Sequence, residues 1–165
     1  MIARALLFAF VFATIGAPRA EALLCHPLLG CSCTVTATDI AFGGLTPLSG
    51  APQYATGEVV VDCTGVIDLA PSVAVKLSSG QGASYATRQL RAAGADAIDY
   101  NIYTTSQHNV VWGDGTGGSA SVAVSGGLLS LGHWNVSRTM HARATPSPTA
   151  QPGVYTDSIV VRIDW

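Results

Sequence analysis

A chain of 165 residues is long enough for one domain, and its composition narrows the class of protein further. Charged residues make up 11% and hydrophobic residues 48%, with 18 glycines and 8 prolines, which excludes both a disordered chain and a coiled coil. Eight basic residues against ten acidic ones give a net charge of −2, so there is no basic surface for nucleic acid.

The chain begins with a pattern typical of a secretory signal peptide. Arg4 precedes an apolar run at residues 5–17, which is too short to span a bilayer comfortably. Ala20 and Ala22 form an A-x-A-like site, so we expect cleavage after Ala22, with cleavage after Ala20 as the alternative. The pattern therefore predicts a signal peptide at residues 1–22.

A short N-terminal segment, residues 23–32, then opens the exported protein. A lipoprotein signal ending at Cys25 competes with this interpretation, but Leu24 stands where lipidation normally needs a small residue. No later apolar run approaches the roughly 20 residues that a helical span requires. We therefore expect a protein without a membrane span that is soluble or part of an assembly.

All four cysteines lie in the exported part, where an even number favours disulfides over free thiols. They are Cys25, Cys31, Cys33 and Cys63, and three connectivities are open from spacing alone. A zinc site is disfavoured, because C-x5-C-x-C beside His26 contains neither C-x2-C nor H-x3-H.

Most of the remaining chain reads as strands and turns, because apolar and polar residues alternate between glycine- and proline-rich breaks. Residues 57–63, for example, place Val59, Val61 and Cys63 on one face. The predicted strands cover residues 35–42, 57–63, 72–78, 97–103, 110–112, 119–124, 128–131 and 136–142. Helix-forming residues gather only at 86–95, where Gly94 interrupts them, so at most one short helical turn is expected.

The last segment, residues 158–165, alternates most regularly. Ile159, Val161, Ile163 and Trp165 point one way, and Ser158, Val160, Arg162 and Asp164 point the other way. Short strands with no helices between them predict an all-β, antiparallel β-sandwich. The pairing of a strand that runs to the last residue stays open.

No residues suggest catalysis. His26, His108, His133 and His141 are scattered, and no serine lies in a G-x-S-x-G turn. Residues 113–118 are glycine-rich, yet they contain no lysine and no second carboxylate, which favours a hairpin loop over a phosphate or calcium site. Neither an enzyme nor a bound cofactor or metal is expected.

Two further acid/base and ligand candidates are weak. Asp96 and Asp99 would lie on opposite faces of an extended segment, so they do not form an acid/base pair. Trp112, Trp134 and Trp165 could serve as stacking platforms for sugars, but strand tryptophans more often belong to the core or to an interface.

Several segments resemble the spore coat protein U domain family, which includes subunits of archaic chaperone–usher pili. The opening resemblance lies in residues 33–38 (CTVTAT), 40–43 (IAFG) with Pro47, and 57–63 (GEVVVDC). It continues through 75–77 (VKL), Gly80, Gly82, Arg88, Leu90, 100–104 (YNIYT), 112–115 (WGDG) and 152–157 (PGVYTD). It covers residues 33–165, and its pieces follow the order and spacing of the family.

The resemblance implies an incomplete immunoglobulin-like sandwich that lacks its last strand and is completed by a donor strand. It also implies a Cys33–Cys63 disulfide, which would leave Cys25 and Cys31 to close a small second loop. The implied partners are a periplasmic chaperone, an outer-membrane usher and neighbouring subunits of a surface pilus with a role in adhesion or biofilm formation. The donor strand would lie along Ile159, Val161, Ile163 and Trp165.

Residues 23–32 (LLCHPLLGCS) differ from what the family uses as a donor strand. Pro27 lacks an N–H for a ladder, and a Cys25–Cys31 loop would turn the segment back on itself. The chain is therefore expected to accept a strand and not to donate one, as a tip or terminal subunit would. The alternatives are a self-contained secreted β-sandwich that binds carbohydrate or protein ligands, a non-fibrous coat protein and, third, an exported hydrolase.

Overall fold

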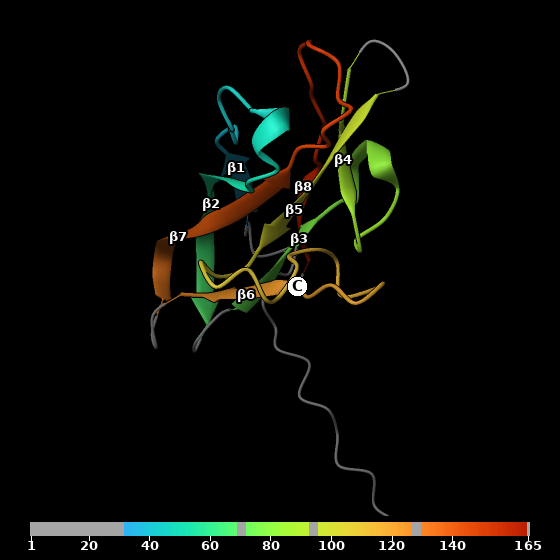
Figure 1. Ribbon diagram of the computed structural model, residues 1–165. Helices are drawn as coiled ribbons and strands as arrows, with labels where there is room; N and C mark the ends of the chain where they lie inside the picture. The colour runs from blue at the N-terminus through green and yellow to red at the C-terminus, as the bar shows by residue number, and fades with distance from the viewer. Residues whose placement is uncertain (1–31, 69–71, 93–95, 127–129, 165) are drawn as a thin grey trace, which may run out of the picture.

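Two antiparallel β-sheets enclose one core in the computed structural model, which describes residues 32–68, 72–92, 96–126 and 130–164 (Figure 1). The five-stranded sheet has the order β1-β2-β7-β5-β4, and the three-stranded sheet has the order β6-β3-β8. The strands are β1 (Ser32–Ala37), β2 (Gln53–Asp68), β3 (Ser72–Leu77), β4 (Arg88–Arg91), β5 (Ala97–Tyr103), β6 (Val122–Ser125), β7 (Ser130–Thr145) and β8 (Val161–Asp164). Two 3-10 turns, η2 (Pro47–Ser49) and η3 (Gly80–Gly82), join them. The predicted all-β antiparallel sandwich is confirmed.

Strands β2 and β7 form the centre of the larger sheet. Each has 16 residues, and they pair from Gln53 opposite Ala144 to Asp68 opposite Ser130, with one register shift between Thr64 and Val66. Such a shift inserts one residue into β2 relative to β7 and bends the strand locally, while β7 continues from Ser130 to Thr145. The predicted strands at 128–131 and 136–142 therefore belong to one continuous strand.

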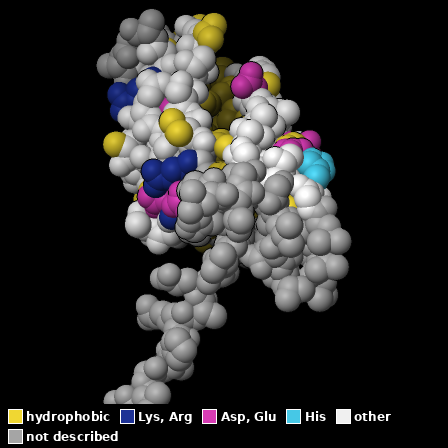
Figure 2. Space-filling view, turned by 180° about the vertical axis from the view of Figure 1, so that it is seen from behind, with side chains coloured by type: hydrophobic (Ala, Val, Ile, Leu, Met, Phe, Trp, Pro, Cys, Tyr) yellow, Lys and Arg dark blue, Asp and Glu magenta, His cyan; other side chains and the backbone are white. Residues whose placement is uncertain are grey.

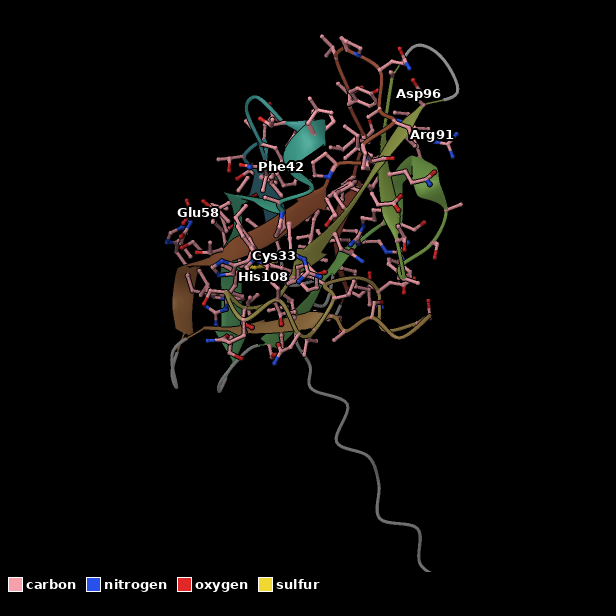
Figure 3. All side chains as sticks on the ribbon, viewed as in Figure 1. Cys33, Phe42, Glu58, Arg91, Asp96 and His108 are labelled. Carbon is pink, nitrogen blue, oxygen red and sulfur yellow. A yellow bond between two sulfur atoms is a disulfide. The ribbon has the colours of Figure 1, made fainter. Side chains whose placement is uncertain are left out.

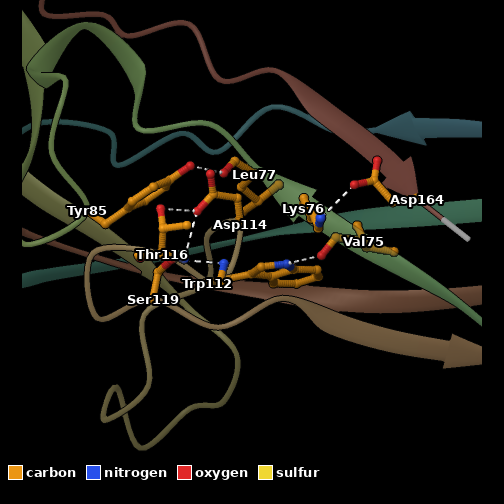
Figure 4. Close-up of polar contacts among 10 residues, drawn as sticks. Val75, Lys76, Leu77, Tyr85, Trp112, Asp114, Thr116, Ser119 and Asp164 are labelled. Atoms are coloured by element: carbon orange, nitrogen blue, oxygen red, sulfur yellow. Dashed lines mark hydrogen bonds and ion pairs between the residues drawn. The ribbon is translucent and has the colours of Figure 1, made fainter.

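The core lies between the two sheets and follows the period-2 alternation of the sequence. From β2 it takes Val59, Val61 and Cys63, and from β3 Val73, Val75 and Leu77, all at most 1% exposed. Trp112 is fully buried between the sheets, and its indole N–H donates to the carbonyl of Val75 at 3.0 Å (Figure 4). Trp112 and Trp134 are thus core residues and not sugar platforms.

Strand β4 occupies residues 88–91 of the segment in which at most one short helical turn was expected, and no helix forms in the described part of that segment, residues 86–92. Arg88 is fully buried, and its guanidinium donates to the carbonyls of Ser78 and Trp112 and to the side-chain oxygen of Asn101, at 2.6–3.1 Å. Burial lowers the pKa of Arg88, but a guanidinium stays charged in proteins. Pairing with β5 and these bonds outweigh the weak helix propensity of the segment.

Several predicted boundaries also differ. Strand β1 ends at Ala37 because the chain leaves β2 there, so residues 38–42 are not a strand. Residues 110–112 form isolated bridges, β6 begins at Val122 and β8 begins at Val161. The predicted signal peptide at 1–22, most of the 23–32 segment, and Cys25, His26, Cys31 and Trp165 lie outside the described residues. Within the described ranges, no helix is long and apolar enough to cross a membrane.

Candidate functional site

An apolar groove of about 1070 Å³ runs along one side of the sandwich. Its walls are residues 37–45 and residues 150–161, and its floor is the inner face of the five-stranded sheet. The floor residues come from β4, β5 and β7; they are Leu90, Ile98, Tyr100, Ile102 and Met140. A hollow with hydrophobic side chains at its base is visible in the upper half of Figure 2. Ile98, Tyr100, Ile102 and Met140 are at most 6% exposed, so the base of the groove is formed by side chains of the core.

The first wall leaves β2 immediately after β1. Thr38 still exchanges hydrogen bonds with Glu58, through its amide at 2.9 Å and its hydroxyl at 2.8 Å. Beyond it, Phe42 packs edge-on against the ring of Tyr100 with centroids 6.0 Å apart. Ile40 passes over Gly57, where a Cβ would lie 2.8 Å from the Ile40 side chain. Only glycine at position 57 lets this wall approach β2 so closely.

The second wall leads into β8, which lies at the edge of the three-stranded sheet. Strand β8 pairs with β3 from Leu77 opposite Val161 to Ala74 opposite Asp164. Lys76 and Asp164 add an ion pair across this pairing (Figure 4). Among the described strands, none pairs with the other edge of β8. Of the four residues of β8, Val161 lines the groove, so this edge begins beside the hollow.

The alternation predicted for the last segment is present in β8 and the residues before it. Ile159 and Val161 line the groove and are half-buried, whereas Val160 is 64% exposed. Ile163 is half-buried and packs against the core, but it does not line the groove. Two of the residues proposed to contact a donor strand therefore line this groove, and Trp165 lies outside the described residues.

The Cys33–Cys63 disulfide is present and joins residues directly opposite each other on β1 and β2. It links an edge strand of six residues to the central strand of the sheet. The connectivity implied by the family resemblance is thus confirmed for this pair.

The remaining candidate residues that the structure describes lie outside the groove. The described histidines lie on the outer face of the larger sheet, where His133 contacts Asp62 at 3.1 Å and His108 packs between Tyr54 and Tyr103. Burial, followed by the charges of Arg143 and His141, lowers the pKa of His108, so its ring packs in the neutral form. No group of three or more metal-ligating residues occurs in the described ranges.

The acidic candidates have structural roles or none. Asp114 accepts hydrogen bonds from the amide and hydroxyl of Thr116, at 2.9 and 2.7 Å, which is the side-chain bonding of a tight turn (Figure 4). These bonds lower the pKa of Asp114. Asp96 lies beside Arg91 where β4 and β5 meet, far from His108 in Figure 3, and Asp99 pairs with Gln89.

Sequence reasoning missed Tyr100, Asp157 and the first wall as parts of the groove. Tyr100 and Asp157 belong to the segments that resemble the family, but this resemblance does not indicate that they contribute to a groove. The alternation of Ile40 and Phe42 was the signal for the first wall, although it was interpreted as part of a paired strand. The groove brings together segments more than fifty residues apart, which no local pattern shows.

Comparison with known proteins agrees with the fold. A family model described as the Spore Coat Protein U domain matches residues 20–162. The chain belongs to the Spore Coat Protein U domain family. This family is structural and not enzymatic, so the groove of this spore coat U domain is not an active site.

A solved structure supports the same fold. A chain in the crystal structure of the CsuC–CsuE chaperone–tip adhesion subunit pre-assembly complex from the archaic chaperone–usher Csu pili of Acinetobacter baumannii aligns with a TM-score of 0.51. Sequence identity is 17%, and the alignment covers 82% of this spore coat U domain chain and 40% of the other chain. At this identity the likeness concerns the fold. A search of the curated proteins finds no match.

Proposed function

We propose that the protein is an exported structural subunit of an archaic chaperone–usher pilus, and that its groove accepts a β-strand from another chain. The observation that carries this is the unpaired edge of β8 beside an apolar groove. An uncovered edge of this kind is an aggregation hazard unless a strand is added to it. Strand addition supplies main-chain hydrogen bonds and places alternate side chains in pockets.

The proposed partners follow from this mechanism. A periplasmic chaperone would occupy the groove first, and at an outer-membrane usher a neighbouring subunit would replace it, which places the assembled protein at the cell surface. The family membership and the pilus-complex structure of the same fold support these partners. An adhesive or biofilm role would belong to the assembled fibre.

Co-expression in a periplasm with and without an archaic-pilus chaperone tests the proposal. The protein is expected to accumulate as a soluble, folded one-to-one complex only when the chaperone is present, because the bare groove otherwise promotes aggregation or strand swapping. Size-exclusion chromatography and circular dichroism measure the outcome. A folded monomer accumulating equally well without chaperone would instead indicate the self-contained, ligand-binding sandwich.

We further propose a tip or terminal position, because residues 23–32 are poorly suited to donate a strand. The segment has a proline at position 27 and two cysteines, Cys25 and Cys31, that can close a loop. N-terminal sequencing of the exported protein and peptide mapping of its disulfides are expected to show a chain starting at Leu23 with a Cys25–Cys31 bond. A longer free extension, or Cys25 bonded elsewhere, would contradict the terminal position.

A further inference from the structure

The second wall of the groove is a corner at which the chain passes from one sheet to the other. Thr156 exchanges two backbone hydrogen bonds, at 2.8 and 3.0 Å, with Arg91 of β4, at the edge of the five-stranded sheet. Val161 already pairs with Leu77 of β3, in the three-stranded sheet. The conformation of the few residues between them therefore determines which side chains turn toward the groove.

Asp157 joins three parts of the molecule at this corner. Its carboxylate accepts a hydrogen bond from the Tyr100 hydroxyl at 2.7 Å, from the Gln81 amide at 2.8 Å and from the adjacent Ser158 amide at 2.7 Å. Tyr100 belongs to the groove floor, and Gln81 belongs to η3, between β3 and β4. One side chain thus connects the wall with the floor and with the turn between the two sheets.

The surroundings are shaped to hold this carboxylate. Gly80 adopts φ +68°, and a Cβ there would overlap the carboxylate of Asp157. The Gln81 side chain also donates to the carbonyl of Thr156 at 3.3 Å. Burial, and then the bond to Asp157, raise the pKa of Tyr100, so the hydroxyl remains a donor. Tyr100 carries the one hydroxyl among the floor residues, and this hydroxyl donates to Asp157.

Strand β8 is short, and its register is held on one side by the pairing with β3 and by the ion pair of Lys76 with Asp164. It has four residues and pairs on one side only. Before β8, the wall bonds to Ser78, the residue that follows β3. The Ser78 amide donates to the Val160 carbonyl, and the Ser78 hydroxyl accepts from the Val160 amide, both at 2.9 Å. A slip by one residue would turn Val160 into the groove and Val161 away from it, because side chains alternate along a strand.

We propose that Asp157 is the positioning residue of the groove, and that its carboxylate determines which face of the following segment receives a donor strand. The consequence for strand capture rests on the proposed function, whereas the orientation of the wall does not. Pinned at Asp157, the wall presents Ile159 and Val161 inward and Val160 outward. A strand can then pair with β8 without first selecting a register.

Thiol labelling tests the orientation without any partner. One additional cysteine is introduced by Val160→Cys or by Val161→Cys into the full exported chain. The chain is kept dilute, so that the bare groove does not promote aggregation, and oxidised, so that its native disulfides stay closed; labelling of the unmodified chain is subtracted. The Val160→Cys chain is expected to react roughly tenfold faster than the Val161→Cys chain, because a packed side chain reacts only when the structure opens locally. In the Asp157→Ala background the two rates are expected to converge. If the labelling contrast, the difference in labelling rate between positions 160 and 161, persists in the Asp157→Ala background, the proposal is overturned, because Asp157 would then only add stability.

Milder variants keep the test decisive should Asp157→Ala fail to fold. Tyr100→Phe removes one of the three bonds and is expected to reduce the contrast, whereas Asp157→Asn keeps an oxygen acceptor and is expected to restore most of it. Tyr155→Phe is the matched control, since its hydroxyl donates to the nearby Gln151 carbonyl at 2.7 Å on the same wall. Equal effects of Tyr100→Phe and Tyr155→Phe would also contradict the proposal.

Chaperone capture is measured separately on the same variants. Slower capture is expected in the order in which the labelling contrast falls. If even the unmodified chain is not captured, the proposed function fails, while the labelling result still decides the role of Asp157.

Discussion

Replacing Val161 with lysine is expected to abolish capture of a donor strand, while the same change at Val160 leaves capture nearly intact. Val161 lines the groove and is half-buried, so a strand bound there would enclose the new ammonium group. Burying an unpaired charge costs several kcal/mol, which corresponds to a loss of affinity of roughly 100-fold or more. Val160 is 64% exposed on the opposite face, so its replacement keeps the charge in water.

Both variants are compared by co-purification with an archaic-pilus chaperone and by titration with a synthetic peptide of the chaperone's donor strand. Circular dichroism of each variant checks that the fold is retained, because a lysine at either position leaves the rest of the core untouched. Equal capture by both variants would mean that the donor strand does not lie against Val161. Loss of capture by Val160→Lys alone would mean that the register is shifted by one residue.

The strands of this fold could be predicted where one face of the strand is buried and the other faces solvent. Residues 72–78 are one example, because Val73, Val75 and Leu77 are buried and alternate with partly exposed residues, and the strand spans Ser72–Leu77. Burial of alternate residues is a local pattern that any half-buried strand must show. The same rule identified Ile159 and Val161 as one face of the last segment.

Local patterns were insufficient where long-range contacts outweigh local preference. The helix-forming residues around Arg88 lie in strand β4, because pairing with β5 and the bonds of the guanidinium to oxygens of other segments outweigh a weak helix propensity. The first wall, with Ile40 and Phe42, alternates like a strand but leaves the sheet after Ala37. Composition and spacing do not show where this wall leaves its pairing with β2.

The groove as a whole was beyond prediction from local patterns. The resemblance to the family implied an acceptor site near the C-terminus, but it did not show that Tyr100 forms the floor or that Asp157 secures the wall. Both features depend on the way the chain passes from its pairing with β4 at Thr156 to its pairing with β3 at Val161. This passage places residues 80–81, 100 and 157 together. A polar contact of this kind has no periodicity and becomes visible only in three dimensions.

Replacing Arg88 with methionine is expected to destabilise the protein by about 3 kcal/mol, because it leaves buried carbonyl groups without donors. The Ser78 and Trp112 carbonyls both receive their side-chain bonds from this guanidinium, which also bonds Asn101. Methionine fills a similar volume and gains apolar burial, but it cannot donate. Two unsatisfied acceptors at roughly 1–3 kcal/mol each outweigh that gain.

Arg91→Met on the same strand is the matched control. Arg91 is exposed and its guanidinium donates only to the side chain of Gln89 among the described hydrogen bonds, so its loss is expected to cost less than about 0.5 kcal/mol. Urea denaturation of each variant in its chaperone complex gives both values at a constant m-value. Similar midpoints for the two variants would show that the guanidinium of Arg88 is dispensable. A large difference would mean that one buried cation, bonded to oxygens from three segments, holds the two sheets together.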